Sequence, residues 1–164
     1  MPTTQEPSKG EMQEKTAYMP QSQTVEWETP QNLFDELNEE FGFTVDIAAS
    51  ALNAKVFPYF DKNTNSLEHP LLWDHQIVWC NPPYGRQIKD WVKMASEAKN
   101  SIVVMLVPAR TDTRWFHEYV YKKQNVEVRF IKGRLKFGGE KNNAPFPNMI
   151  IIFSPTQGDR KRNE

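Results

Sequence analysis

Large apolar residues recur at the three-to-four-residue spacing of a helix in two stretches of the chain. In the first stretch they are Leu33, Phe34, Leu37 and Phe41. Thr29-Pro30 before this stretch is typical of an N-cap followed by proline at the first helical position, and Gly42 after it is typical of a helix end. The second stretch, residues 87–99, carries Ile88, Trp91, Val92 and Ala95. The pattern predicts two amphipathic helices, each with one face against a core.

Short apolar runs alternate with these helices and predict strands. The runs cover residues 43–48, 77–80, 102–107, 126–131, 135–137 and 149–153. The run at 102–107 is apolar throughout, which is typical of a parallel strand buried on both faces. A third helix is expected over about residues 113–122, where Thr111-Asp112-Thr113 supplies side chains that can cap it. Because strands and helices alternate, the sequence predicts an α/β fold with helices on both faces of one sheet.

Length and composition set the domain organisation. With 164 residues, of which 38% are hydrophobic, the chain suits one domain of ordinary size. Residues 1–23 are rich in Gln, Glu, Thr, Pro and Ser, so they hold too little apolar surface to offset the entropy of ordering and are expected to be disordered. Residues 155–164 have a similar character and are expected to form a disordered basic tail. We therefore expect one folded domain over residues 24–154.

Membrane and disulfide chemistry are not expected. The longest apolar runs, residues 102–107 and 149–153, are far shorter than the roughly 20 residues that a membrane span needs. The N-terminal stretch has no apolar region typical of a secretory signal, and the lone Cys80 excludes an internal disulfide. These features predict a soluble protein of the reducing cytoplasm.

Charge is divided unevenly along the chain. The net charge of −1 combines four Lys and Arg against thirteen Asp and Glu in residues 1–80 with sixteen against eight in residues 81–164, or −9 and +8. In one interpretation the basic half faces the phosphates of a nucleic acid. In the other, the two halves attract each other within the fold or across a dimer. Charge alone does not separate these interpretations.

Several common site motifs are missing from the sequence. There is no GxGxxG after a strand and no GxxxxGK[ST], so neither a dinucleotide fingerprint nor a Walker phosphate loop is expected. His69, His75 and His117 lack the spacing of zinc ligands, and no metal site is expected. No G-x-S-x-G elbow supports a serine hydrolase.

The tetrapeptide Asn81-Pro82-Pro83-Tyr84 follows directly on the predicted strand at 77–80. At average residue frequencies this string is expected in fewer than about one in a thousand chains of this length. Two prolines fix φ near about −65° and donate no N–H, so the loop presents carbonyl oxygens in a rigid geometry. The Asn81 side-chain oxygen and the Pro82 carbonyl can both accept hydrogen bonds from one planar NH2 group, and the Tyr84 ring offers a flat face for stacking.

This arrangement suits methylation of an aromatic amine. The lone pair of such an amine is delocalised into the ring, which makes the nitrogen a poor nucleophile. Two acceptors on its hydrogens would help to localise the lone pair, and alignment with an electrophilic methyl group would then permit direct transfer. The residues Asn81, Pro82, Pro83 and Tyr84 are therefore the candidate catalytic loop.

The strand that runs into this loop resembles motif IV of S-adenosylmethionine-dependent amino-methyltransferases. The chain from Glu26 to Phe153 is similar, more specifically, to the phage-type DNA N6-adenine methyltransferases (Dam-like). The blocks that carry the resemblance are residues 26–30, 46–50, 81–86, 108–116, 133–139 and 144–147. The resemblance implies a trimmed Rossmann-like methyltransferase sheet, since the interval between Asp46 and Asn81 is too short for the helices and strands that usually lie there. For a phage-encoded protein the expected location is the host cytoplasm.

The resemblance also implies that the cofactor is S-adenosyl-L-methionine. The implied cofactor-binding residues are Trp27, Thr29, Pro30, Asp46, Ala48 and Asp61. Asp46 ends the first predicted strand, where a carboxylate is well placed to bind an ammonium or hydroxyl group, although it is also placed to cap a helix. Asp61 is a candidate for the cofactor ribose or a plain loop residue. The glycine-rich form of the cofactor motif is absent, because residues 47–50 read Ile-Ala-Ala-Ser.

Contacts to DNA are implied in the same way. The implied DNA-binding residues are Arg86, Arg110, Arg114, Arg134, Lys136 and Phe137. The basic side chains lie within the resembling blocks, and the alternative is ordinary surface charge. Phe137 is expected to be exposed beside Gly138-Gly139, where its ring can wedge into or stack on DNA. Trp91 and Trp115 are expected to pack in the core.

Taken with the resemblance, these features predict a site-specific DNA adenine-N6 methyltransferase. It would act as a monomer or homodimer on double-stranded DNA and turn its target adenine out of the helix, because the amino group is paired inside it. One alternative is the same chemistry on cytosine N4, on RNA adenine or on a protein glutamine amide. Another is a DNA-binding module without catalysis. The positive C-terminal half favours nucleic acid, and the complete loop at 81–84 favours a catalyst.

Overall fold

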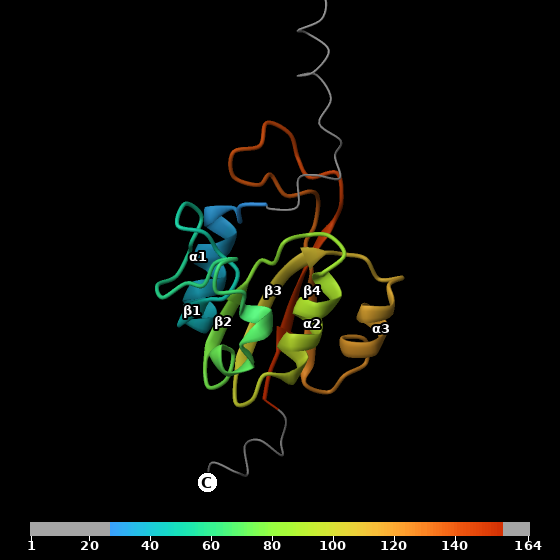
Figure 1. The fold of residues 1–164 in the computed structure, drawn as a ribbon. Helices are drawn as coiled ribbons and strands as arrows, with labels where there is room; N and C mark the ends of the chain where they lie inside the picture. The colour runs from blue at the N-terminus through green and yellow to red at the C-terminus, as the bar shows by residue number, and fades with distance from the viewer. Residues whose placement is uncertain (1–26, 156–164) are drawn as a thin grey trace, which may run out of the picture.

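One mixed sheet forms the centre of the protein (Figure 1). The computed structural model describes residues 27–155. The strands of these residues are β1 (Val45–Asp46), β2 (Ile77–Cys80), β3 (Ile102–Pro108), β4 (Val126–Phe130) and β5 (Asn148–Phe153). They lie in the order β1-β2-β3-β5-β4, with β1, β2 and β3 parallel and β5 antiparallel to both of its neighbours. The chain thus has the mixed α/β architecture that the sequence predicts.

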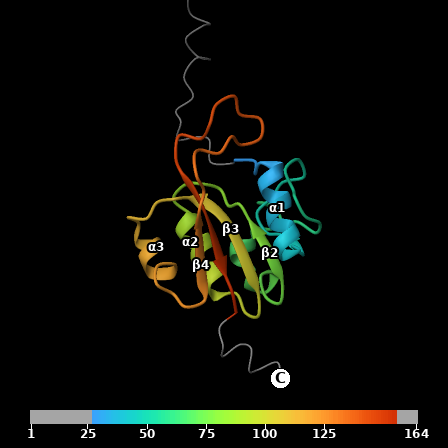
Figure 2. The same cartoon turned by 180° about the vertical axis from the view of Figure 1, so that it is seen from behind.

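Helices lie against both faces of this sheet. They are α1 (Gln31–Phe41), α2 (Ile88–Glu97) and α3 (Arg114–Tyr119); two short 3-10 turns, Ser66–Glu68 and Pro70–Leu72, lie between β1 and β2. α2 lies in front of the strands in Figure 1 and behind them in Figure 2, whereas α1 is nearer the viewer in Figure 2. The helices predicted from apolar spacing are therefore confirmed, and they enclose the sheet as expected.

The start of α1 differs from the prediction by one residue. Pro30, not Thr29, occupies the N-cap position, and no side chain caps this end of the helix. The Thr29 hydroxyl instead accepts a hydrogen bond from Asn81 Nδ2 at 3.0 Å. At the other end Gly42 has a φ of 67° and its N–H donates to the Asn38 carbonyl, which is the glycine stop that the sequence predicts. Thr29 thus serves the loop after β2 and not the helix.

Aromatic side chains join the helices to the rest of the core. The ring of Trp79 on β2 lies 5.5 Å from Phe34 on α1 and 5.4 Å from Phe43. On α2, Trp91 lies 5.9 Å from Trp73. Aromatic pairs of this kind contribute about 0.5–1.5 kcal/mol beyond the area that they bury. The first cluster holds β2, which leads into the candidate catalytic loop, against α1, and the second holds α2 against the segment before β2.

Three predicted elements differ from the structure. Residues 135–137 form no strand, and the only ladder-like contact nearby within residues 27–155 is a single bridge between Glu28 and Gly138. Their apolar character reflects the burial of Phe137, not strand pairing. The helix predicted over 113–122 is shorter, although Thr113 does cap it by accepting from the Phe116 N–H at 3.4 Å. The strand predicted over 43–48 pairs only at Val45–Asp46.

The predicted disordered segments, residues 1–23 and 155–164, fall outside the described residues apart from Pro155. The boundaries proposed for the folded domain at residues 24 and 154 therefore stay predictions. Between residues 27 and 155, no helix combines the length and the apolar character needed to cross a membrane.

Candidate active site

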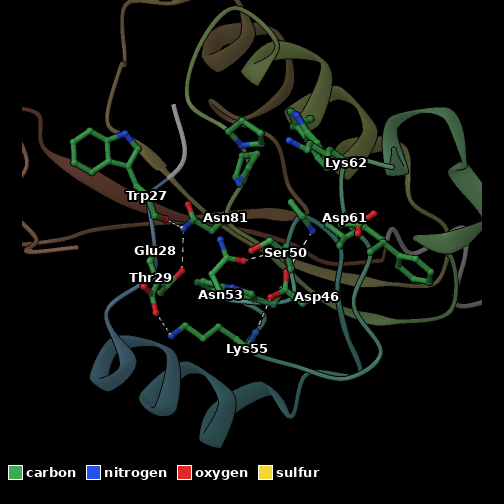
Figure 3. A pocket seen from close by; sticks show the side chains of 18 of the residues that line it. Trp27, Glu28, Thr29, Asp46, Ser50, Asn53, Lys55, Asp61, Lys62 and Asn81 are labelled. Atoms are coloured by element: carbon green, nitrogen blue, oxygen red, sulfur yellow. Dashed lines mark hydrogen bonds and ion pairs between the residues drawn. The ribbon is translucent and has the colours of Figure 1, made fainter. Parts of the chain in front are cut away.

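The carboxyl ends of β1 and β2 form one edge of the site. The register pairs Asp46 with Trp79, so Asp46 ends its strand beside the strand that runs into Asn81. Ligands of α/β sheets bind at this edge. A cavity of about 240 Å³ lies there (Figure 3). Of the predicted residues, it is lined by Trp27, Thr29, Asp46, Ala48, Asp61, Asn81, Pro82 and Pro83.

Asn81 is held by its amide nitrogen and leaves its amide oxygen unused. Nδ2 donates to the Trp27 carbonyl and to the Thr29 hydroxyl (Figure 3). Reversing the amide would set Oδ1 against the Trp27 carbonyl oxygen, so these contacts fix its orientation. Oδ1 is buried and has no hydrogen-bond partner among residues 27–155. The loop therefore begins with one free, oriented acceptor in the wall of the cavity.

Asp46 is a buried carboxylate that holds the loop after β1. Its Oδ1 accepts from the Ala48 N–H at 3.3 Å and its Oδ2 from the Lys55 N–H at 2.9 Å. Burial raises the pKa of this carboxyl from 3.8 to about 6, against the lowering effect of those two hydrogen bonds and of the Lys55 charge. The side chain is therefore ionised at pH 7. No helix begins at Asp46, so the helix-cap interpretation is wrong.

Lys55 links the cavity to α1 and is a residue that the sequence analysis missed. Its Nζ donates to Gln31 Oε1 at 2.8 Å and lies 3.7 Å from the Glu28 carboxylate. Further lining residues that were not predicted are Ser50, Asn53, Lys62, Asn65, Gln87 and Trp91. Most of them belong to the polar sequence that follows β1, and that polarity is the signal that points to them.

Asp61 lies across the cavity from Thr29 in Figure 3. Its Oδ1 accepts the N–H groups of Asn63 at 3.0 Å and Thr64 at 3.3 Å, which is the geometry of a side chain that holds its own turn. The same residue lines the cavity. Its two interpretations, a loop residue and a ligand contact, are therefore compatible.

An aromatic cluster holds the other end of the candidate catalytic loop. The Tyr84 hydroxyl donates to the Leu106 carbonyl at 3.1 Å, and its ring meets Phe137 and Phe146 edge-on at 6.2 and 5.6 Å. Trp27 contacts both of those rings, at 5.2 and 5.4 Å. The expectation of an exposed Phe137 is wrong, because its ring is 1% exposed and completes this cluster. Its ring cannot reach DNA without leaving the core.

A second, larger depression of about 970 Å³ borders the same loop. Tyr84 and Gly85 line it, while Asn81 and the two prolines line the first cavity, and Trp27 lines both. Its walls include the exposed side chains Arg86 and Arg110. The aromatic lining residues of this depression are Trp27, Tyr84, Trp115 and Phe146. The loop therefore lies between a carboxylate-lined cavity and a depression with aromatic and basic walls.

Five predicted residues lie outside these two hollows. Pro30, Lys136 and the buried Phe137 line a third hollow, beside Gly138. Arg114 is exposed and lies 3.4 Å from the Glu118 carboxylate of its own helix. Arg134 is exposed and lines none of the three hollows described here. The structure thus brings Arg86 and Arg110 to the candidate catalytic loop, whereas the other basic candidates line neither hollow beside it.

Sequence comparisons show which known proteins this chain is similar to. A family model described as DNA N-6-adenine-methyltransferase (Dam) matches residues 16–162. The chain is 35% identical over 96 residues to the DNA N-6-adenine-methyltransferase of Escherichia phage T1, a match that covers 56% of this chain and 39% of that protein. It is 31% identical over 81 residues to YfdM of Escherichia coli (strain K12), provisionally named a methyltransferase, covering 45% of this chain and 87% of that one. The match thus spans less than half of the phage relative.

Proposed function

The chain belongs to the DNA N-6-adenine-methyltransferase (Dam) family, and from this premise we propose that it transfers a methyl group from S-adenosylmethionine to the N6 amino group of an adenine in double-stranded DNA. One observation supports the proposal most, the buried Asn81 Oδ1 that no residue of the described part uses. Buried polar atoms are normally hydrogen-bonded, so an unused acceptor in a cavity wall indicates a ligand that donates to it. The N6 amino group of adenine is such a donor.

We propose that the sheet is a trimmed Rossmann-like methyltransferase sheet. Its parallel strands β1, β2 and β3, with α2 as the crossover between the last two, place the candidate site at their carboxyl ends. Between β1 and β2 the regular structure consists of two 3-10 turns. This agrees with the shortened interval expected between Asp46 and Asn81.

The chemistry of the first cavity fits S-adenosylmethionine. This molecule carries a positive ammonium and sulfonium, a carboxylate and ribose hydroxyls, and the cavity offers the carboxylates of Asp46 and Asp61. Because its pKa is about 6, Asp46 is negatively charged at neutral pH and attracts a cationic ligand. Asp46 and Ala48 would hold the methionine part, and Asp61 the ribose. When bound, the cofactor supplies an electrophilic methyl group on its positive sulfur.

Asn81 would prepare the adenine nitrogen for attack. The N6 lone pair is delocalised into the ring, so the free amine is a poor nucleophile. Asn81 Oδ1 would accept one N6 hydrogen and the Pro82 carbonyl the other, which would favour a pyramidal nitrogen whose lone pair is localised and not shared with the ring. The contacts from Nδ2 to Trp27 and Thr29 hold the acceptor in place before the substrate arrives. Positioning of the two reacting atoms then supplies most of the remaining rate.

The second depression suits the target base. An adenine inside duplex DNA is stacked and its amino group is paired, so it must be turned out before it can react. A flat base would lie against the wall that contains Tyr84 and Phe146, and Arg86 and Arg110 would contact the flanking phosphates. Basic side chains at this depression favour a nucleic acid over a protein amide.

Transfer of labelled methyl from S-adenosylmethionine to unmethylated duplex DNA tests the proposal, with digestion of the product to nucleosides. We expect N6-methyladenine. Label on cytosine, on RNA or on a protein amide would identify one of the alternative planar amines as the substrate. Binding to DNA without any binding of the cofactor would instead support a non-catalytic DNA-binding module.

A further inference from the structure

Trp91 and Trp73 are neighbouring buried side chains whose indole N–H groups differ in hydrogen bonding. Their rings lie 5.9 Å apart and both are buried, Trp73 at 0% and Trp91 at 6% exposure. The Trp73 Nε1–H donates to the Ser66 carbonyl at 3.0 Å. The Trp91 Nε1–H is buried with no hydrogen-bond partner among residues 27–155. Only Trp91 of this pair lines the first cavity.

A buried indole N–H without a partner is costly to the folded state. Buried Trp N–H groups usually find an acceptor, and leaving one unpaired costs on the order of 1–3 kcal/mol. Packing alone does not account for the indole, since a phenylalanine ring would fill the same kind of apolar contact without burying a donor. The cost indicates a second task for this side chain, beyond the core packing that the sequence analysis expected.

The cavity contains a complementary pair of unpaired groups. Asn81 Oδ1 is an unpaired acceptor and Trp91 Nε1–H an unpaired donor, and both residues line the same space. The two residues that line this space belong to different elements, the loop after β2 and the helix α2. In the proposed function the target amine donates to Asn81 Oδ1, so the Trp91 N–H is left for an acceptor atom of the molecule that occupies the cavity.

We propose that Trp91 is a cofactor-binding residue whose indole N–H donates a hydrogen bond to an acceptor atom of S-adenosylmethionine. The inference rests on the proposed function, because it takes that molecule as the occupant of the first cavity. Two parts of the ligand carry acceptors, the carboxylate of its amino-acid part and the nucleoside. The fragment 5′-methylthioadenosine has the nucleoside without the amino-acid part, so it distinguishes these two sources.

The test compares Trp91→Phe with Trp73→Phe, which removes the neighbouring, satisfied donor. Binding of S-adenosylmethionine and of the fragment is measured by isothermal titration calorimetry. We expect Trp91→Phe to weaken S-adenosylmethionine binding about tenfold and Trp73→Phe to leave it within about twofold. If Trp91→Phe weakens binding of the fragment to the same extent, the hydrogen bond goes to the nucleoside. If it weakens binding of S-adenosylmethionine alone, the bond goes to the carboxylate. Unchanged binding by Trp91→Phe overturns the inference.

A measurement on the unaltered protein guards against misfolded variants. In a spectrum of 15N-labelled indole groups, the Trp91 N–H signal should shift downfield when S-adenosylmethionine is added, because it gains an acceptor. A signal that does not move overturns the inference while leaving the proposed function standing. Failure of the wild-type protein to bind S-adenosylmethionine at all would overturn both, and calorimetry separates these outcomes.

Discussion

Replacing the buried carboxylate of Asp46 should change how stability depends on pH. The pKa of this group rises from 3.8 to about 6 on folding, mainly through burial. The shift of roughly two units corresponds to about 3 kcal/mol. Because the folded state holds the proton more tightly than the unfolded state, this stability is fully present below pH 3.8 and is lost as the pH rises through 6.

The assay is urea unfolding of the wild-type protein and of Asp46→Asn across pH 3.5 to 7.5, with Asp112→Asn as a control for the loss of one exposed charge. Relative to Asp46→Asn, the wild-type free energy of unfolding should fall by about 3 kcal/mol over the whole range, of which about 2 kcal/mol is lost between pH 4 and pH 6, and it should be level above about pH 7. Asparagine keeps an oxygen for only one of the two N–H groups that Asp46 accepts, so the variant carries a constant offset. Parallel profiles for the two proteins would refute the reasoning.

The same titration should appear in cofactor binding. If the ionised Asp46 attracts the ammonium or sulfonium, affinity for S-adenosylmethionine should fall up to about tenfold for each pH unit below 6. In Asp46→Asn the affinity should be lower at pH 7.5 and should lose this dependence. A wild-type affinity that stays constant from pH 7.5 to 5 would show that Asp46 does not attract the cofactor.

Four other substitutions, at three residues, test the aromatic cluster and the DNA contacts. Phe137→Ala should lower the free energy of unfolding in urea by about 3–5 kcal/mol, because it empties a fully buried site, and a loss below about 1 kcal/mol would contradict that burial. Tyr84→Phe should lower the free energy of unfolding by about 1 kcal/mol, because the hydrogen bond to Leu106 is lost, yet it should keep most methyl transfer. Tyr84→Ala should lose most methyl transfer. Equal losses of transfer in the two variants would assign the role to the hydroxyl and not to the ring. Arg110→Ala should weaken DNA binding and reduce its salt slope by about one, and an unchanged slope would exclude a phosphate contact.

The regular elements could be read from the sequence because their signals are local. The apolar runs that became β2, β3 and β5 end within a residue of their predicted bounds, and Gly42 ends α1 as expected. The strand predicted at residues 135–137 is not formed, because the apolar character of these residues has a long-range cause. Phe137 is apolar because it packs against Trp27, Tyr84 and Phe146, which come from three other segments, and no local pattern reveals such a contact.

In the candidate site, too, local signals could be read from the sequence and long-range contacts could not. Asn81 was predicted from the Asn-Pro-Pro-Tyr string and Asp46 from the family resemblance, and both lie at strand ends, where parallel strands bring their carboxyl ends together. Thr29 was assigned to a helix cap on its local sequence. Its hydroxyl instead holds the Asn81 amide, and this contact with a residue 52 positions away leaves no local signal. Trp91 was predicted to pack, which it does, but the missing partner of its N–H is visible only in three dimensions.

The most direct test of the central claim is single-turnover methyl transfer by Asn81→Ala, with S-adenosylmethionine binding measured on the same preparation. If Asn81 Oδ1 accepts from the target amine, transfer to adenine should be lost while the cofactor still binds within a few-fold of the wild-type affinity. Thr29→Ala, which removes one of the two acceptors that orient the Asn81 amide, should show a smaller loss in the same assay. Normal turnover by Asn81→Ala would contradict the account.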